Sequence, residues 1–232
     1  MIKDLLTAFG AESSLSLAAD DFQRMTELAR DMTLAASAQY WAGPGQLDTR
    51  SRLERDDVRM NQLQRSIRRR VFLHLSAGEP ADAPYCLALM SLVKDIERVG
   101  DYAKNLVAVP HMVGQADTVL PTQDSLVAAL REFALGVEQL ADAAPAAYKA
   151  SDPVAIRELL ASGKRQSAES VALLRRVARD DCNAALATRL TLTIRFYKRI
   201  QGHFMNLLAS VLIPPDRMKS GEGPDELREL AC

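Results

Sequence analysis

The sequence has 232 residues, of which 48% are hydrophobic, 25% are charged and 5% are aromatic, and its net charge at neutral pH is −1. This balance argues against a molecule that binds polyanions over its whole surface, and no apolar run reaches the ~20 residues that a membrane-spanning helix needs. Strand patterns are scarce, whereas alanine, leucine, arginine and glutamate, which favour helices, are common. The three cysteines, Cys86, Cys182 and Cys232, occur without an export signal and predict reduced thiols in a cytoplasmic protein.

Apolar residues at steps of three and four predict three helices in the first half of the chain. These helices are expected over residues 16–41, 51–77 and 84–109. Ser51 and Glu54 fit a capping box at the start of the second helix, and Pro110 is expected to end the third. Residues 113–121 then form a predicted linker.

Three further helices are expected over residues 123–149, 151–179 and 182–213. Thr122 is the predicted cap of the first of these, and Pro145 is expected to kink it or end it early. Asp152 followed by Pro153 marks the start of the next helix, because aspartate caps helices and proline suits their first turn. The pair 180–181, both aspartates, is expected to cap the last helix.

The order of three helices, a linker and three helices predicts a duplication. At an offset of about 101 positions, residues 92–107 align with 193–208, and Arg98 meets Arg199 while Asn105 meets Asn206. The predicted organisation is a first repeat over 1–112, a linker over 113–121, a degenerate second repeat over 122–215 and a flexible tail over 216–232. The predicted fold class is all-α, with two tandem three-helix bundles or one elongated six-helix bundle.

Four oxygen-bearing side chains form a candidate metal site in the first half. Glu97 and Asp101 share a helix face at four-residue spacing, and Asp57 is expected at an inward position of the preceding helix, with Asn61 one turn on. Such a set suits a hard divalent cation such as Mg²⁺, Mn²⁺ or Fe²⁺. The absence of histidine and cysteine from this set argues against a structural zinc site.

Salt bridges offer a second explanation of the same acidic residues. Lys94 lies three positions before Glu97, and Arg98 and Lys104 lie three positions either side of Asp101. Pairing with these basic side chains would account for the acids without a metal. The spacing leaves both interpretations open.

The third helix also resembles a known family. Residues 94–106, Lys-Asp-Ile-Glu-Arg-Val-Gly-Asp-Tyr-Ala-Lys-Asn-Leu, resemble the signature helix of the phosphate-uptake regulator (PhoU) family, and residues 57–61 resemble an element of its second helix. The resemblance implies two three-helix bundles that each carry an acidic motif, and it leaves iron, manganese, magnesium and zinc as candidate metals. It also implies a regulator, not an enzyme, that binds a phosphate transporter and a sensor kinase.

On this interpretation Asp57, Asn61, Glu97 and Asp101 hold the metal, with Asp95 in support. The chain reaches the membrane only through its protein partner and binds no nucleic acid, and whether it forms a homodimer stays open. The alternative function is a non-catalytic scaffold, or an accessory domain of another transporter, whose acidic motif only forms salt bridges.

The second half departs from the family pattern. Lys198 aligns with Glu97, Gly202 with Asp101 and Lys164 with Asp57. Two lysines at expected acidic positions predict one metal site in the chain instead of two.

The arginines of the second helix could bind phosphate or nucleic acid, but a solvated face is the favoured explanation. No aromatic residues alternate with them to stack on bases.

Overall fold

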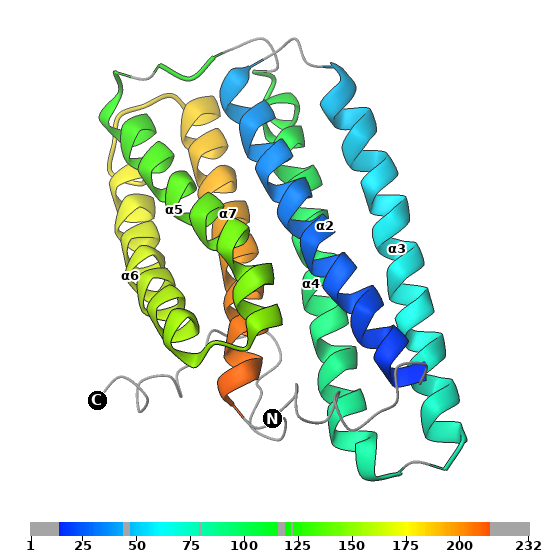
Figure 1. Ribbon diagram of the computed structural model, residues 1–232. Helices are drawn as coiled ribbons and strands as arrows, with labels where there is room; N and C mark the ends of the chain where they lie inside the picture. Colours follow the sequence, from blue (N-terminus) through cyan, green and yellow to red (C-terminus); the bar gives the residue numbers. More distant parts are fainter. Residues whose placement is uncertain (1–13, 44–46, 79, 116–118, 122, 214–232) are drawn as a thin grey trace.

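The computed structural model describes residues 14–43, 47–78, 80–115, 119–121 and 123–213. Within these ranges every regular element is helical, with six α-helices and one short 3₁₀-helix. The α-helices alternate in direction along the chain (Figure 1). The predicted all-α, up-and-down class is therefore confirmed.

The six long helices follow the predicted order, with ends that differ by a few residues. In chain order the elements are α2 (Ser14–Ala42), α3 (Leu47–Ser76), η1 (Pro80–Asp82), α4 (Ala83–Met112), α5 (Ser125–Ala150), α6 (Pro153–Val177) and α7 (Ala184–Leu212). Within the described part of the chain, none of these helices is long and apolar enough to span a membrane.

The helices pack as two groups that share one continuous core. α2, α3 and α4 contact one another, α5, α6 and α7 contact one another, and the groups meet where α4 packs on α7 and α2 on α5. α3 lies at the outer edge of the molecule (Figure 1). The predicted repeat and linker boundaries stay predictions, and residues 216–232 lie outside the described ranges.

Four predicted helix starts can be compared with the structure. α3 begins at Leu47, so Ser51 and Glu54 lie inside the helix and the predicted capping box is wrong. Asp152 accepts hydrogen bonds from the first turn of α6, as expected. α5 is capped by Asp124 instead of Thr122, and α7 by Asn183 instead of Asp180 and Asp181. The errors at α5 and α7 share a cause, because several residues able to cap a helix stand close together at both starts.

Two prolines lie inside helices that they were expected to end or distort. α4 continues past Pro110 to Met112, and α5 continues past Pro145 to Ala150. Pro110 falls in the last turn of α4, and its carbonyl accepts a hydrogen bond from Gln115 N at 2.8 Å. Each proline has no N–H to donate to the carbonyl four residues earlier, so each helix continues with one intrahelical hydrogen bond missing.

The contact between α4 and α7 repeats itself at the sequence offset of the duplication. The Asp95 carboxylate of α4 lies 3.0 Å from His203 Nδ1 of α7. Adding the offset of 101 to Asp95 gives Phe196, and subtracting it from His203 gives Tyr102, and these two rings also meet, with centroids 6.0 Å apart. The antiparallel pair of helices therefore carries two equivalent contacts, as a pseudo-twofold axis requires.

Candidate functional site

Three of the four predicted metal-binding residues lie together between α3 and α4, around the ammonium group of Lys104. Lys104 Nζ lies 2.7 Å from Asp57 Oδ1 and 3.2 Å from Asp101 Oδ1. Asn61 Nδ2 donates a hydrogen bond of 3.4 Å to the other oxygen of Asp57. The cation at the centre of this group is therefore a lysine side chain.

The electrostatics of this group favour a charged lysine. Burial lowers the pKa of Lys104, but the hydrogen bonds and negative charges of Asp57 and Asp101 outweigh it and raise the pKa above its ordinary value. The lysine therefore neutralises two carboxylates that would otherwise repel each other.

Glu97, the fourth predicted residue, pairs with its own helix. Its Oε2 accepts a hydrogen bond of 2.6 Å from Lys94 Nζ, and its side chain is mostly buried. Within the described residues, no group of three or more histidine, cysteine, aspartate or glutamate side chains has the arrangement of a metal site. The metal site of Asp57, Asn61, Glu97 and Asp101 stays a prediction.

The sequence pattern predicted the wrong aspartate at the inward-facing position of α3. Asp56, not Asp57, lies in the buried stripe, where Arg52 and Arg59 pair with it at 3.6 and 3.3 Å. Asp57 is only partly buried and faces Lys104 from the edge of the helix contact. Both aspartates give a regular helical spacing with Leu53 and Met60, so the sequence pattern could not separate them.

Asp95, predicted to support the metal site, points instead to the second half of the chain. Besides His203, it accepts a hydrogen bond of 3.3 Å from Asn206 Nδ2. The His203 side chain is buried, and its Nε2 atom has no hydrogen-bond partner in the described part of the molecule. The first aspartate of the motif thus joins α4 to α7, a role that sequence spacing could not indicate because its partners lie 108 and 111 positions away.

A second polar cluster joins the two groups of helices through α2, α5 and α7. The hydroxyl of Tyr197, whose ring is fully buried, lies 2.6 Å from Ser37 Oγ and accepts a hydrogen bond of 3.0 Å from Trp41 Nε1. Ser37 also donates to Glu138, which accepts from Arg131 at 2.8 Å. These side chains satisfy one another across the contact, as buried polar groups must.

The aligned positions of the second half carry no acidic group. Lys198 and Lys164 are both partly buried, and the space beside Gly202 is open: apart from the surrounding turns of its own helix, no atom of the described residues lies within 4 Å of where a side chain would begin. The aligned positions therefore differ in charge between the two halves, and the single metal site stays a prediction.

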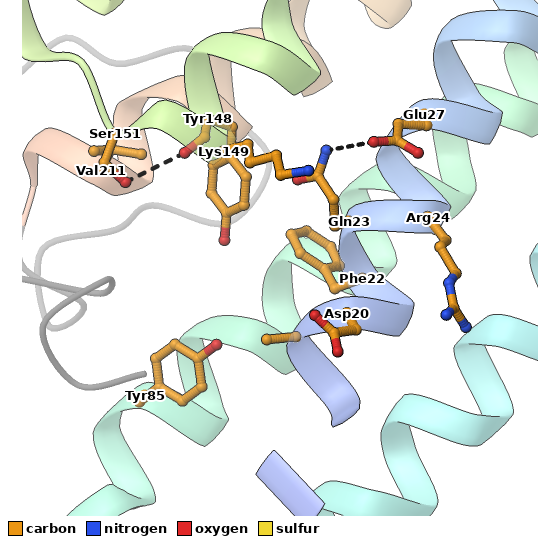
Figure 2. A pocket seen from close by; sticks show the side chains of 11 residues that line it. Asp20, Phe22, Gln23, Arg24, Glu27, Tyr85, Tyr148, Lys149, Ser151 and Val211 are labelled. Atoms are coloured by element: carbon orange, nitrogen blue, oxygen red, sulfur yellow. Dashed lines mark hydrogen bonds between the residues drawn. The ribbon is translucent and has the colours of Figure 1, made fainter. Parts of the chain in front are cut away.

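A pocket of about 510 Å³ lies where the first turns of α2 meet α4 and the ends of α5 and α7 (Figure 2). Phe22, Tyr85 and Tyr148 supply its aromatic part, and the Phe22 and Tyr148 rings pack edge to face with centroids 5.7 Å apart. Burial raises the pKa of both tyrosines, so their hydroxyls stay neutral. Sequence reasoning missed this pocket, because its lining comes from four helices.

The charges around the pocket do not select an anion or a cation. Asp20 and Glu27 supply negative charge, and Arg24 and Lys149 supply positive charge. Gln23 in the lining already donates a hydrogen bond of 2.8 Å to Glu27, which Figure 2 marks. The pocket is therefore a poor match to phosphate, which would favour a surplus of positive charge.

The fold and the acidic motif define the class of protein: an all-α protein of two three-helix groups, in which the motif of Glu97 and Asp101 has no acidic counterpart at the aligned positions of the second group. Comparison with known proteins shows which family this class of helical protein resembles. Residues 22–109, which include the helix with the acidic motif, match the family model of the PhoU domain. This match confirms the predicted resemblance to the PhoU family for this part of the chain.

Two solved structures share the fold over almost the whole chain. PhoU from Pseudomonas aeruginosa aligns with a TM-score of 0.75 at 17% identity, covering 88% of this chain and 97% of that protein. The phosphate transport system regulatory protein PhoU from Streptococcus pneumoniae aligns with a TM-score of 0.69 at 14% identity, covering 90% and 97%. No curated protein matches the chain by sequence.

Proposed function

We propose that this protein regulates inorganic phosphate uptake, without catalysing a reaction, by binding a phosphate transporter, a sensor kinase or both in the cytoplasm. The observation that carries the proposal is the PhoU-domain match over residues 22–109. The shared fold supports it, since one of the similar structures is described as a phosphate transport system regulatory protein.

The test is a deletion of the gene in its own host, followed by measurement of radiolabelled phosphate uptake and of a phosphate-starvation reporter in phosphate-rich medium. We expect both to rise in the deletion strain and to return to normal when the wild-type gene is restored. Uptake and reporter activity that stay unchanged on deletion would contradict the proposal. Capture of the transporter or kinase by the tagged full-length chain would then identify the partner.

The acidic group between α3 and α4 is the proposed site of a divalent cation, held by Asp57, Asn61, Glu97 and Asp101. Two carboxylates and an amide already lie together there, and these are ligands that hard cations prefer. For a metal to bind, the ammonium of Lys104 must leave the two aspartates and Glu97 must turn away from Lys94. Metal binding on this proposal is a competition with two lysines.

The competition makes opposite predictions for two sets of variants. Glu97→Ala with Asp101→Ala should abolish binding of Mn²⁺ or Fe²⁺, whereas Lys104→Gln should strengthen it, measured by calorimetry on the purified protein. Mn²⁺ that raises the melting temperature of the wild type and the double variant equally would place the site elsewhere. Two equivalents of metal, one in each half, would contradict the single-site prediction.

A second candidate function is a helical scaffold, or an accessory domain of another transporter, in which the same acids only form salt bridges. The observation that favours it is that Asp57, Glu97 and Asp101 each already contact a lysine. On this view Lys104→Gln creates no metal site and only lowers stability, because two carboxylates lose their shared counter-charge. The calorimetry above therefore separates the two candidates.

A further inference from the structure

The outer face of α3 differs from an ordinary solvated helix face. Opposite its buried stripe, exposed residues recur at alternating steps of four and three along the helix: Val58, Gln62, Arg65, Arg69, Phe72 and Ser76. This spacing keeps them in one line, so that α3 has a second continuous face directed away from the core. We call these residues, with the neighbouring Arg68 and Leu73, the outer stripe.

The outer stripe concentrates positive charge that the rest of α3 does not neutralise. From position 58 to 76 the sequence has five arginines and no acidic residue, although the whole chain has a net charge of −1. Arg59 and Arg70 pair with Asp56 and Asp21. The other three, Arg65, Arg68 and Arg69, are exposed and form no ion pair within the described part of the molecule.

Large apolar side chains lie exposed directly beyond these arginines, at the hairpin end of the bundle. Phe72 is 70% exposed and Leu73 is 49% exposed. Across the hairpin, near the start of α4, Leu87 is also 70% exposed. The buried contact of 2.7 Å between His74 and Asp82 ties the end of α3 to the hairpin. The backbone that carries Phe72 and Leu73 is therefore held in place.

We propose that the outer stripe of α3 binds directly to the anionic headgroups of a phospholipid bilayer. Arg65, Arg68 and Arg69 lie at the level of the lipid phosphates, and Phe72 and Leu73 enter the boundary between headgroups and acyl chains. Basic residues beside exposed aromatic and aliphatic ones are the composition that favours such interfacial binding.

The shape of this region favours a bilayer over an acidic protein. α3 lies at the edge of the molecule, and α2 and α4 support only its inner side (Figure 1). A helix at the edge of a bundle presents a convex outer surface, which a deformable lipid surface accommodates without a matching groove. The contact adds a direct attachment to the expected route through a protein partner, and it does not depend on the proposed function.

The test is co-sedimentation of the full-length protein with vesicles of phosphatidylcholine alone or mixed with phosphatidylglycerol. We expect binding only to the mixed vesicles, and release as the salt concentration rises from about 0.1 M to 0.5 M, because salt screens exposed charges. Each arginine near an anionic surface contributes about fivefold in affinity, so Arg65→Gln with Arg68→Gln and Arg69→Gln should weaken binding roughly a hundredfold.

A matched control removes the same charge from the other half of the molecule. Arg157, Arg165 and Arg175 of α6 are also exposed, and their replacement by glutamine should leave vesicle binding unchanged. Phe72→Ser should weaken binding roughly tenfold through lost apolar burial, whereas Val154→Ser, at a position 63% exposed on α6, should not. Circular dichroism and melting temperatures establish that each variant is folded.

Three outcomes would overturn the proposal. The first is equal binding to neutral and anionic vesicles, and the second is an equal loss of binding in the α6 control and the α3 variant. The third is retention on immobilised polyglutamate without binding to anionic vesicles, which would assign the stripe to an acidic protein. Because the vesicles contain no protein, failure here leaves the proposed regulation of phosphate uptake untouched.

Discussion

The third helix of each group, α4 in the first and α7 in the second, packs in the same way but with different side chains at the contact. At one of their two equivalent contacts, Asp95 meets His203. At the other, Phe196 meets Tyr102. The comparison teaches that the two helices pack alike at both positions of the predicted duplication, while the side chains at the contact differ, polar at one and aromatic at the other.

The acidic motif differs between the two helices as well. α4 has Glu97 and Asp101 where α7 has Lys198 and Gly202, yet both helices lie in equivalent places and bury continuous apolar stripes. The acids are therefore not needed to form a helix of this type. Residues that a fold does not need are those most open to a binding role or to loss.

The largest expected effect is a loss of stability at alkaline pH, which should affect both halves of the molecule equally. Burial raises the pKa of Tyr40 and Tyr85 in the first half and of Tyr148 and Tyr197 in the second. Their neutral forms contribute stability that is fully present below the ordinary tyrosine pKa of about 10 and is lost as the pH rises above it. The loss is about 1.4 kcal/mol for each tyrosine and each pH unit.

Urea unfolding at increasing pH, with tyrosinate absorbance recorded in parallel, measures this effect. We expect absorbance and unfolding to change together above pH 10. Tyrosinate that forms near pH 10 while the fold stays intact would contradict the burial of these side chains.

The next largest effect distinguishes the two equivalent contacts of α4 and α7. Asp95→Ala leaves His203 and Asn206 without their acceptor and should lower the free energy of unfolding by about 2 kcal/mol. Phe196→Leu, at the other contact, should cost about 1 kcal/mol or less, since most apolar packing remains. Chemical denaturation compares the two, and a larger loss for Phe196→Leu would reverse this comparison.

A smaller effect tests a hydroxyl that only the second half has. Tyr197 aligns with Ile96, and both side chains are fully buried. Tyr197→Phe removes the group that contacts Ser37 and Trp41 and should cost about 1 kcal/mol. Ser37→Ala in the Tyr197→Phe background should then cost less than in the wild type, and equal costs would show that the two hydroxyls do not cooperate.

The smallest effect concerns the acidic motif itself. Glu97→Gln removes a salt bridge to Lys94, whose side chain is about half exposed, and should change stability by no more than about 0.5 kcal/mol. Thermal unfolding without added metal measures it. A much larger loss would mean that the charge of Glu97 supports the stability of the first half.

The sequence was sufficient for the helices because each of them buries a regular apolar stripe. α2 was predicted within two residues at its start and one at its end, and Asp152 with Pro153 marked the start of α6 correctly. Where two neighbouring residues satisfy the same rule, as Asp56 and Asp57 do, local spacing could not choose between them. The choice depends on how the whole helix is rotated against its neighbours.

The candidate site was predictable only within α3 and α4. The expected packing of neighbouring helices brought Asp57 and Asn61 of α3 close to Asp101 of α4, but nothing local indicated that Lys104 would lie between the two aspartates. Asp95 could not be matched with His203, nor Tyr85 with Tyr148 in the pocket, because such contacts depend on how distant helices pack. Sequence patterns describe one helix at a time, whereas each of these sites is formed by side chains from several helices.

The alternating directions of the helices have a consequence for circular permutation of the chain. The start of α2 and the end of α7 lie at the same end of the molecule (Figure 1). A linker between them, with a new opening between α4 and α5, would exchange the order of the two halves without re-routing any helix. Such a circular permutant should fold to the same structure. It would differ from the natural chain only in its connections and in the order of the two halves along the sequence.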